Sequence, residues 1–239
     1  NGNHQYGRER EGNMMAKISS EDVQKNSRIR ILVEQANACL ETLGYTDHGP
    51  RHVGYVSKIA GEILEKLGYP EERVELARIA GWTHDVGNMI NRKMHSLTGA
   101  TLLFDELQRI GMDLQDVCDI CSAVGSHDEE TGTPVSDISA ALIIADKVDA
   151  YKKRVKRKDM DDIHDRVNLS IYETDVRVSQ EKNQITFELK MKEHATPMEF
   201  LQIYLGRMKM CEKSAKFLGC TFKLVINGLV MNKVGGQQA

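Results

Sequence analysis

The sequence predicts a mainly α-helical protein that ends in a small β-β-α-β module, and three observations support this prediction. From about residue 20 to residue 158, apolar residues recur with the three- to four-residue spacing of amphipathic helices. Between Ile185 and Met191, apolar and polar residues alternate strictly, which is typical of a half-buried strand. No apolar run approaches the roughly 18 residues of a membrane span, so we expect no membrane partner.

The 239 residues suffice for one large domain with an appendage, and 41% hydrophobic with 28% charged residues is a globular balance. We expect a flexible tail over 1–19, a helical domain over 20–166 and the C-terminal module over 167–239. A net charge of -3 provides no general attraction for nucleic acid or an anionic membrane. No signal-peptide pattern is recognisable, which favours a cytoplasmic location.

Start and stop signals delimit the predicted helices. Ser19 or Ser20 caps a first helix that continues to Gly44, and Pro50 suits the first turn of the second. A third helix begins near Pro70 and is broken by Gly87. Three further helices are predicted over 97–110, 114–125 and 136–158. The basic run 152–158 closes the last of them and indicates a solvated helix end rather than a nucleic-acid site.

The C-terminal module is predicted from a change of period. A strand through Val176 and Val178, a turn over 179–183 and the strand over 185–191 form a hairpin. Thr196-Pro197-Met198-Glu199 has the spacing of a capping box and starts a helix that stops at Gly219. A last strand is expected from Phe222 to Val230.

Several residues able to bind metal ions lie near the ends of the predicted helices. His84 and Asp85 are adjacent, at the end of an apolar helix and just before a glycine. An imidazole beside a carboxylate suits Fe, Mn, Zn or Co better than Ca, which prefers oxygen ligands alone. A helical bundle can direct side chains from several helix ends toward one interior point. The further candidates are His52, His95 and His127, together with Asp146, which lies inside the apolar helix predicted over 136–158.

The order of His52, His84-Asp85 and Asp146 resembles the H…HD…D signature of the HD-domain superfamily. The added His95 and His127 are similar to its dinuclear members, and the likeness is greatest to bacterial hydrolases of dinucleoside polyphosphates. The resemblance covers roughly residues 25–155 and implies an HD-domain helical bundle. It does not extend to the C-terminal module.

The resemblance also implies a chemistry. His52, His84 and Asp146 would bind one divalent metal, His95 and His127 a second, and the catalytic Asp85 would bridge the two. Fe and Mn are the favoured ions, with Zn, Co, Ni or Mg as alternatives, and one or two ions per chain remain open. The implied reaction is hydrolysis of a phosphate ester or anhydride, with a nucleotide favoured as substrate, by a metal-activated hydroxide.

Three residues beside the implied ligands are candidates for substrate binding, namely His48, Arg51 and Lys147. Asp149 either reaches the site or is a solvated or lysine-paired carboxylate. The sequence departs from many relatives at Asn88, where a lysine is common. It also reads Gly132-Thr133-Pro134 where cyclic-dinucleotide phosphodiesterases have Gly-Tyr-Pro, which puts a cyclic dinucleotide in doubt as substrate.

Two other functions fit the same residues. A diiron pair held by this ligand set activates oxygen in some proteins of the HD fold. Alternatively, the protein senses a nucleotide without turnover and uses its C-terminal module to bind a partner. The small size and strand edges of that module also suggest a homodimer formed through it.

Overall fold

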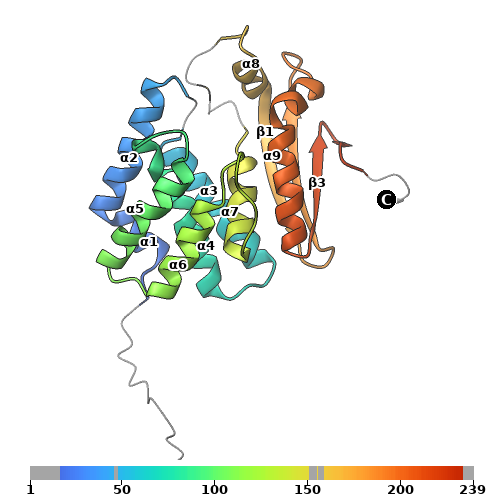
Figure 1. Ribbon diagram of the computed structural model, residues 1–239. Helices are drawn as coiled ribbons and strands as arrows, with labels where there is room; N and C mark the ends of the chain where they lie inside the picture. Colours follow the sequence, from blue (N-terminus) through green and yellow to red (C-terminus); the bar gives the residue numbers. More distant parts are fainter. Residues whose placement is uncertain (1–16, 46–47, 151–154, 156–158, 234–239) are drawn as a thin grey trace, which may run out of the picture.

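The computed structural model describes residues 17–45, 48–150, 155 and 159–233. Helices α1 to α7 form one body, and α8, α9 and a four-stranded sheet form a second layer beside it (Figure 1). The prediction of a mainly helical protein with a small C-terminal β-containing module is therefore confirmed. Most of the predicted N-terminal tail, up to residue 16, lies outside the described residues.

The first predicted helix is two helices in the structure, which corrects the sequence prediction. α1 (Ser20–Lys25) ends at Asn26, and α2 (Ser27–Thr42) begins directly after it. Asn26 has φ -66° and ψ 120°, which is an extended conformation. Its side chain accepts hydrogen bonds from the backbone N–H groups of Arg28 and Ile29, so it caps α2 and stops the helical ladder of α1.

α3 (Pro50–Lys66) and α4 (Glu71–Thr83) lie against each other at close range. α3 begins at Pro50 as predicted. α4 stops at Thr83, before the predicted glycine break, and a 3-10 turn η1 (Val86–Met89) follows. The two helices approach closely at Gly81, which has no side chain. A Cβ atom at this position would lie only 2.6 Å from the Cα atom of Ser57 in α3.

Substituting Gly81 by alanine is expected to destabilise the protein by about 2–3 kcal/mol, because the new methyl group would push two helix backbones apart. Gly54→Ala is the matched control. A Cβ atom there would meet the Trp82 ring at 3.7 Å, an ordinary contact, and alanine favours helix by up to about 1 kcal/mol. Urea unfolding of both variants measures the difference. Equal stability of the two variants would contradict the close approach.

Three further helices complete the helical body, namely α5 (His95–Arg109), α6 (Leu114–Gly125) and α7 (Asp137–Lys147). α7 is buried on nearly every side, as expected of a central helix. The predicted continuation of this helix to residue 158 is wrong, because α7 ends at Lys147. Beyond it, the Asp149 carboxylate binds Arg51 and His52, and this turns the chain away from the helix axis. The basic run 152–158 lies outside the described residues apart from Val155.

The C-terminal layer contains α8 (Ile163–Ser170), α9 (Pro197–Phe217) and one sheet. Its strands are β1 (Ile171–Ser179), β2 (Gln184–Met191), β3 (Thr221–Ile226) and β4 (Leu229–Val230), in the order β1-β2-β3-β4. β1 and β2 form the predicted antiparallel hairpin, β3 runs parallel to β2, and β4 is antiparallel to β3.

Two details of this layer differ from the sequence prediction. α8 was not expected, and it runs across residue 166, where the sequence placed a boundary. The last predicted strand is two strands, because Asn227 and Gly228 take positive φ values of 51° and 81° and form a tight turn.

α9 connects the two layers. It contacts α7 on one side and the sheet on the other, and its capping box at Thr196 is formed as predicted (Figure 1). Along the same helix Phe200, Tyr204 and Cys211 are buried. The end of α7 that carries Asp146 is thus supported by the C-terminal layer. Across the part of the chain that the structure describes, no helix has both the length and the apolar character needed to cross a membrane.

Candidate metal centre

The six predicted metal ligands come together at one place in the helical body. Each lies at or beside a helix end: His52 in the first turn of α3, His84 and Asp85 after α4, His95 at the start of α5, His127 after α6, and Asp146 in the last turn of α7. Asp146 differs from the prediction, which placed it inside a longer helix. The four imidazoles and Asp85 are buried, and the Asp146 side chain is 12% exposed. The fold therefore gathers four imidazoles and two carboxylates from five helix ends.

Each of the four histidines has its Nδ1 atom engaged away from the centre. The Nδ1 atoms of His84, His95 and His127 lie 2.9, 3.0 and 2.6 Å from the backbone carbonyls of Gly81, Arg92 and Val124. A carbonyl only accepts, so each of these Nδ1 atoms donates a proton. The lone pair of a neutral ring then belongs to Nε2, the atom that points toward the centre.

The first group of facing ligand atoms belongs to His52, His84 and Asp146. The two Nε2 atoms lie 3.3 Å apart, and they lie 3.4 and 3.6 Å from Oδ1 of Asp146. Ligands about 2.1 Å from an ion, at angles of roughly 90–110° to one another, are separated by about 3.0–3.4 Å. The spacing of these three atoms fits a shared metal ion.

The second group belongs to His95 and His127, whose Nε2 atoms lie 3.1 Å apart. Asp85 lies between the two groups. Its Oδ1 atom is 3.5 Å from Nε2 of His95, while Oδ2 is 3.5 and 3.7 Å from Nε2 of His84 and His52. One carboxylate thus presents an oxygen to each pair of histidines, which is the position of a bridging ligand.

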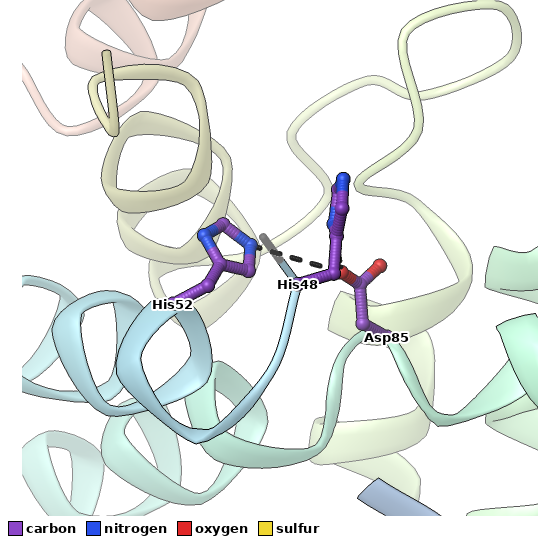
Figure 2. A group of neighbouring side chains, drawn as sticks. All are labelled: His48, His52 and Asp85. Atoms are coloured by element: carbon purple, nitrogen blue, oxygen red, sulfur yellow. Dashed lines mark hydrogen bonds and ion pairs between the residues drawn. The ribbon is translucent and has the colours of Figure 1, made fainter. Parts of the chain in front are cut away.

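His48 and Asn88 hold the Asp85 side chain in this position. Nδ1 of His48 lies 2.7 Å from Oδ2 of Asp85, and Nδ2 of Asn88 donates to Oδ1 at 2.9 Å. Figure 2 shows His48 beside Asp85, with His52 facing the same carboxylate from the first turn of α3. Asn88, at the position where the sequence comparison expected lysine in many relatives, therefore orients the predicted ligand Asp85. His48, expected at the substrate, contacts this carboxylate and also lines the adjoining pocket.

The surroundings lower the pKa of both carboxylates and of two of the histidines. Burial by itself would raise the pKa of Asp85, but the rings of His84, His48 and His52 outweigh it and hold the pKa well below its usual value. Asp146 behaves alike, because Lys147 and two imidazoles outweigh its burial and lower its pKa. Burial lowers the pKa of His95 and that of His127. Charged carboxylates and neutral imidazoles are the protonation states that bind a metal ion.

The donor set fits a divalent transition metal. The Nε2 atoms of His52 and His84 lie 3.3 Å apart, and those of His95 and His127 lie 3.1 Å apart. Lone pairs of neutral rings at this distance repel each other, and a cation bound by both rings would outweigh the repulsion. Among the described residues, three groups have ligand atoms within 4.8 Å of one another, namely His48–His52–Asp85, His52–His84–Asp146 and His84–Asp85–His127. Mixed nitrogen and oxygen ligands suit Fe, Mn, Zn or Co.

Asp149 lies behind the centre rather than in it. Its Oδ2 atom accepts from Nδ1 of His52 at 2.6 Å, and the carboxylate also pairs with the Arg51 guanidinium at 2.8 and 3.2 Å. The structure shows a carboxylate that is paired with an arginine and a histidine rather than with the lysine considered from the sequence, and this contact fixes the ring orientation of His52. Arg51, a candidate for substrate binding, is engaged in that pair and does not line the pocket.

Asp149→Asn is expected to weaken metal binding about 10- to 100-fold, because a partner that orients a liganding histidine contributes that much to affinity. Arg51→Gln is the control, since it removes the guanidinium but leaves the hydrogen bond between Asp149 and His52. Competition with a fluorescent chelator measures both affinities. If the two variants lose affinity equally, the ion pair rather than the hydrogen bond to His52 is responsible.

Four of the six predicted ligands line a pocket of about 520 Å³, namely Asp85, His95, His127 and Asp146. Lys147, a candidate for substrate binding, also lines it, and its ammonium group donates to Oδ2 of Asp146 at 2.5 Å. Sequence reasoning missed most of the other pocket residues. They are Tyr45, Asn91, Arg92, Lys93, Met94, Asp128, Glu129, Glu130 and Arg207. These residues come from segments without a motif, and Arg207 comes from the C-terminal layer, so no local pattern could have identified them.

Part of the chain matches a known protein family. Residues 51–153 match the HD domain family, and this span contains all six predicted ligands. The chain is 26% identical over 192 residues to "Uncharacterized protein MJ1020" of Methanocaldococcus jannaschii, a match that covers 70% of this chain and 73% of that protein. A "predicted HD superfamily hydrolase" from an uncultured Thermotogales bacterium superposes with a TM-score of 0.41 and 24% identity, over 52% of this chain and 67% of that one.

Proposed function

We propose that this protein is a metal-dependent phosphohydrolase that cleaves a phosphate ester or anhydride, with a nucleotide as the favoured substrate. The observation that carries the proposal is the position of Asp85, whose two oxygens face two separate pairs of histidines and which lines the pocket. The match of residues 51–153 to the HD domain family also supports the proposed function. Under this proposal, the site is dinuclear.

The chain's own residues have distinct roles in such a reaction. His52, His84 and Asp146 would hold one ion, and His95 and His127 a second, with Asp85 between them. Bound ions supply a water of lowered pKa and positive charge against the phosphoryl oxygens. Lys147 lies beside Asp146 in the pocket, where its ammonium group can contact a phosphoryl oxygen.

Two side chains that line the pocket, Tyr45 and Arg92, favour a nucleotide as the substrate. The Tyr45 side chain lines the pocket, the residue is 44% exposed, and the Arg92 guanidinium lies 5.5 Å from the centre of its ring. A tyrosine ring and a guanidinium plane at the mouth provide a surface on which a base can stack, an interaction of about 1–3 kcal/mol. The phosphate would then reach the metal centre while the base remains near Tyr45.

Metal content and phosphate release, measured on the same protein, test the proposal. Wild-type protein loaded anaerobically with Mn²⁺ or Fe²⁺ is expected to bind near two ions per chain and to release phosphate from a panel of nucleotides and dinucleotides. His127→Ala should bind about one ion and lose release. One ion in the wild type, with release surviving in His127→Ala, would contradict the dinuclear site.

Two other results would replace the proposed function. Two irons per chain that consume oxygen without phosphate release would identify an oxygenase. Tight nucleotide binding without turnover in any divalent metal would identify a sensor.

A further inference from the structure

The C-terminal layer contributes a cation to the metal pocket. Arg207 lies near the middle of α9, the helix that packs between α7 and the sheet, and its side chain lines the same pocket as Asp146 and Lys147. The residue stands more than fifty positions beyond the end of the segment that matches the HD domain family, residues 51–153. The pocket above the metal centre is thus completed by an element outside that segment.

Contacts on two sides fix the guanidinium group. Its Nε atom pairs with the carboxylate of Glu129, which follows His127 and Asp128 in the loop after α6. Its carbon atom lies 5.1 Å from the centre of the Tyr204 ring, one turn earlier on α9. The Nη1 and Nη2 atoms donate no hydrogen bond to any residue that the structure describes, and the side chain is 27% exposed.

These contacts leave the outer edge of the guanidinium group available to a ligand. An arginine presents its N–H groups in a planar fork that matches two oxygens of one phosphate. Glu129 occupies the Nε side and leaves both amino groups. A rigid partner such as the Tyr204 ring lowers the conformational entropy that binding would otherwise cost.

The other charges of the pocket favour an anion on this side. Lys147 and Arg207 both lie at the pocket wall, and Lys147 shares its charge with Asp146. The acids Asp128 and Glu130 also line the pocket, so its wall is not uniformly basic. A polyanion bound at the metal centre would meet Lys147 beside Asp146 and Arg207 at the wall, where Glu129 balances part of the arginine charge.

We propose that Arg207 binds a second phosphate of the substrate, next to the phosphate at the metal centre. The C-terminal layer then selects substrates that carry at least two linked phosphates, such as nucleoside di- and triphosphates or dinucleoside polyphosphates. This inference rests on the proposed function, because it requires that a first phosphate binds at the metal centre.

Calorimetric titration of the Mn²⁺-loaded full chain tests the inference, with inorganic phosphate and inorganic triphosphate as probes and equal free Mn²⁺ in both solutions. Arg207→Gln is expected to weaken triphosphate binding about 10- to 100-fold, the range for a lost hydrogen bond to a charged group. Orthophosphate binding should change less than twofold. Arg177→Gln, an exposed residue on β1 of the same layer, is the control and should leave both affinities unchanged.

A second variant keeps the test decisive if Arg207→Gln folds poorly. Glu129→Gln removes the counter-charge of the guanidinium group and is expected to tighten triphosphate binding several-fold. Unchanged triphosphate affinity in both variants, or an equal loss of both probes in Arg207→Gln, would overturn the inference while the proposed function stands. If the wild type binds neither probe and releases no phosphate from nucleotides, the proposed function fails and the inference fails with it.

Discussion

Asp85→Asn is expected to lower phosphate release at least about 10³-fold and to reduce the metal content below one ion per chain. Asp85 is the carboxylate whose oxygens face both pairs of histidines, at 3.5 Å from His84 and 3.5 Å from His95. An amide removes the negative charge from both metal positions. A loss of about 4 kcal/mol of transition-state stabilisation corresponds to about 10³ in rate. Elemental analysis and a phosphate assay on the same preparation measure both effects.

A control separates loss of the metal centre from loss of the fold. Asp137→Asn alters another partly buried carboxylate, one that pairs with Arg73 at the start of α7, far along the helix from Asp146. This control should unfold more easily and keep its metal content. An Asp85→Asn protein that retains two ions and more than a tenth of wild-type release would show that Asp85 does not bridge.

The sequence predicted which candidate ligands come together better than it predicted the elements that carry them. Each predicted ligand lies at a helix end, and helix ends carry local signals such as Pro50 and the capping residues. Their convergence on one point does not follow from those signals. It follows from tertiary packing. At the level of the sequence, we could predict this convergence only from the resemblance to the HD-domain superfamily.

The prediction was wrong at two places where a side-chain hydrogen bond ends a helix. The apolar pattern of 136–158 continues past Lys147, but the Asp149 carboxylate binds Arg51 and His52 on α3, and the helix ends. Likewise, the first helix was predicted to run from Ser19 or Ser20 to Gly44, but the side chain of Asn26 caps a second helix within it. In both cases a side-chain hydrogen bond decides where a helix stops, and periodicity contains no information about it.

The pocket walls were the least predictable part. Tyr45, Arg92 and Arg207 come from separate segments, and each is an ordinary surface residue type in its own sequence context. Arg207 reaches the pocket because α9 packs against α7. Asp149 and Asn88 are intermediate cases. Their nearness to the ligands was visible in the sequence, but their hydrogen bonds to His52 and Asp85 were not.

Removal of metal is expected to lower the melting temperature by roughly 8–16 °C. Six ligands from five helix ends meet at one buried point, so ions that bind the folded state tie these helices together. At a free metal concentration 1,000 times the dissociation constant, binding stabilises the folded state by about 4 kcal/mol. For a protein of this size, each kcal/mol corresponds to about 2–4 °C. Calorimetry with a chelator and then with increasing Mn²⁺ measures the shift.

Two variants test whether the shift in melting temperature arises from ions bound at the candidate metal centre. His84→Ala removes a ring whose Nε2 atom faces His52, Asp85 and Asp146, so Mn²⁺ should raise its melting temperature by less than a third of the wild-type shift. His194→Ala changes an exposed histidine outside the cluster and should show the full wild-type shift. If Mn²⁺ stabilises all three proteins equally, the ions bind elsewhere. Because this measurement needs no substrate, it tests the metal centre independently of the reaction proposed for it.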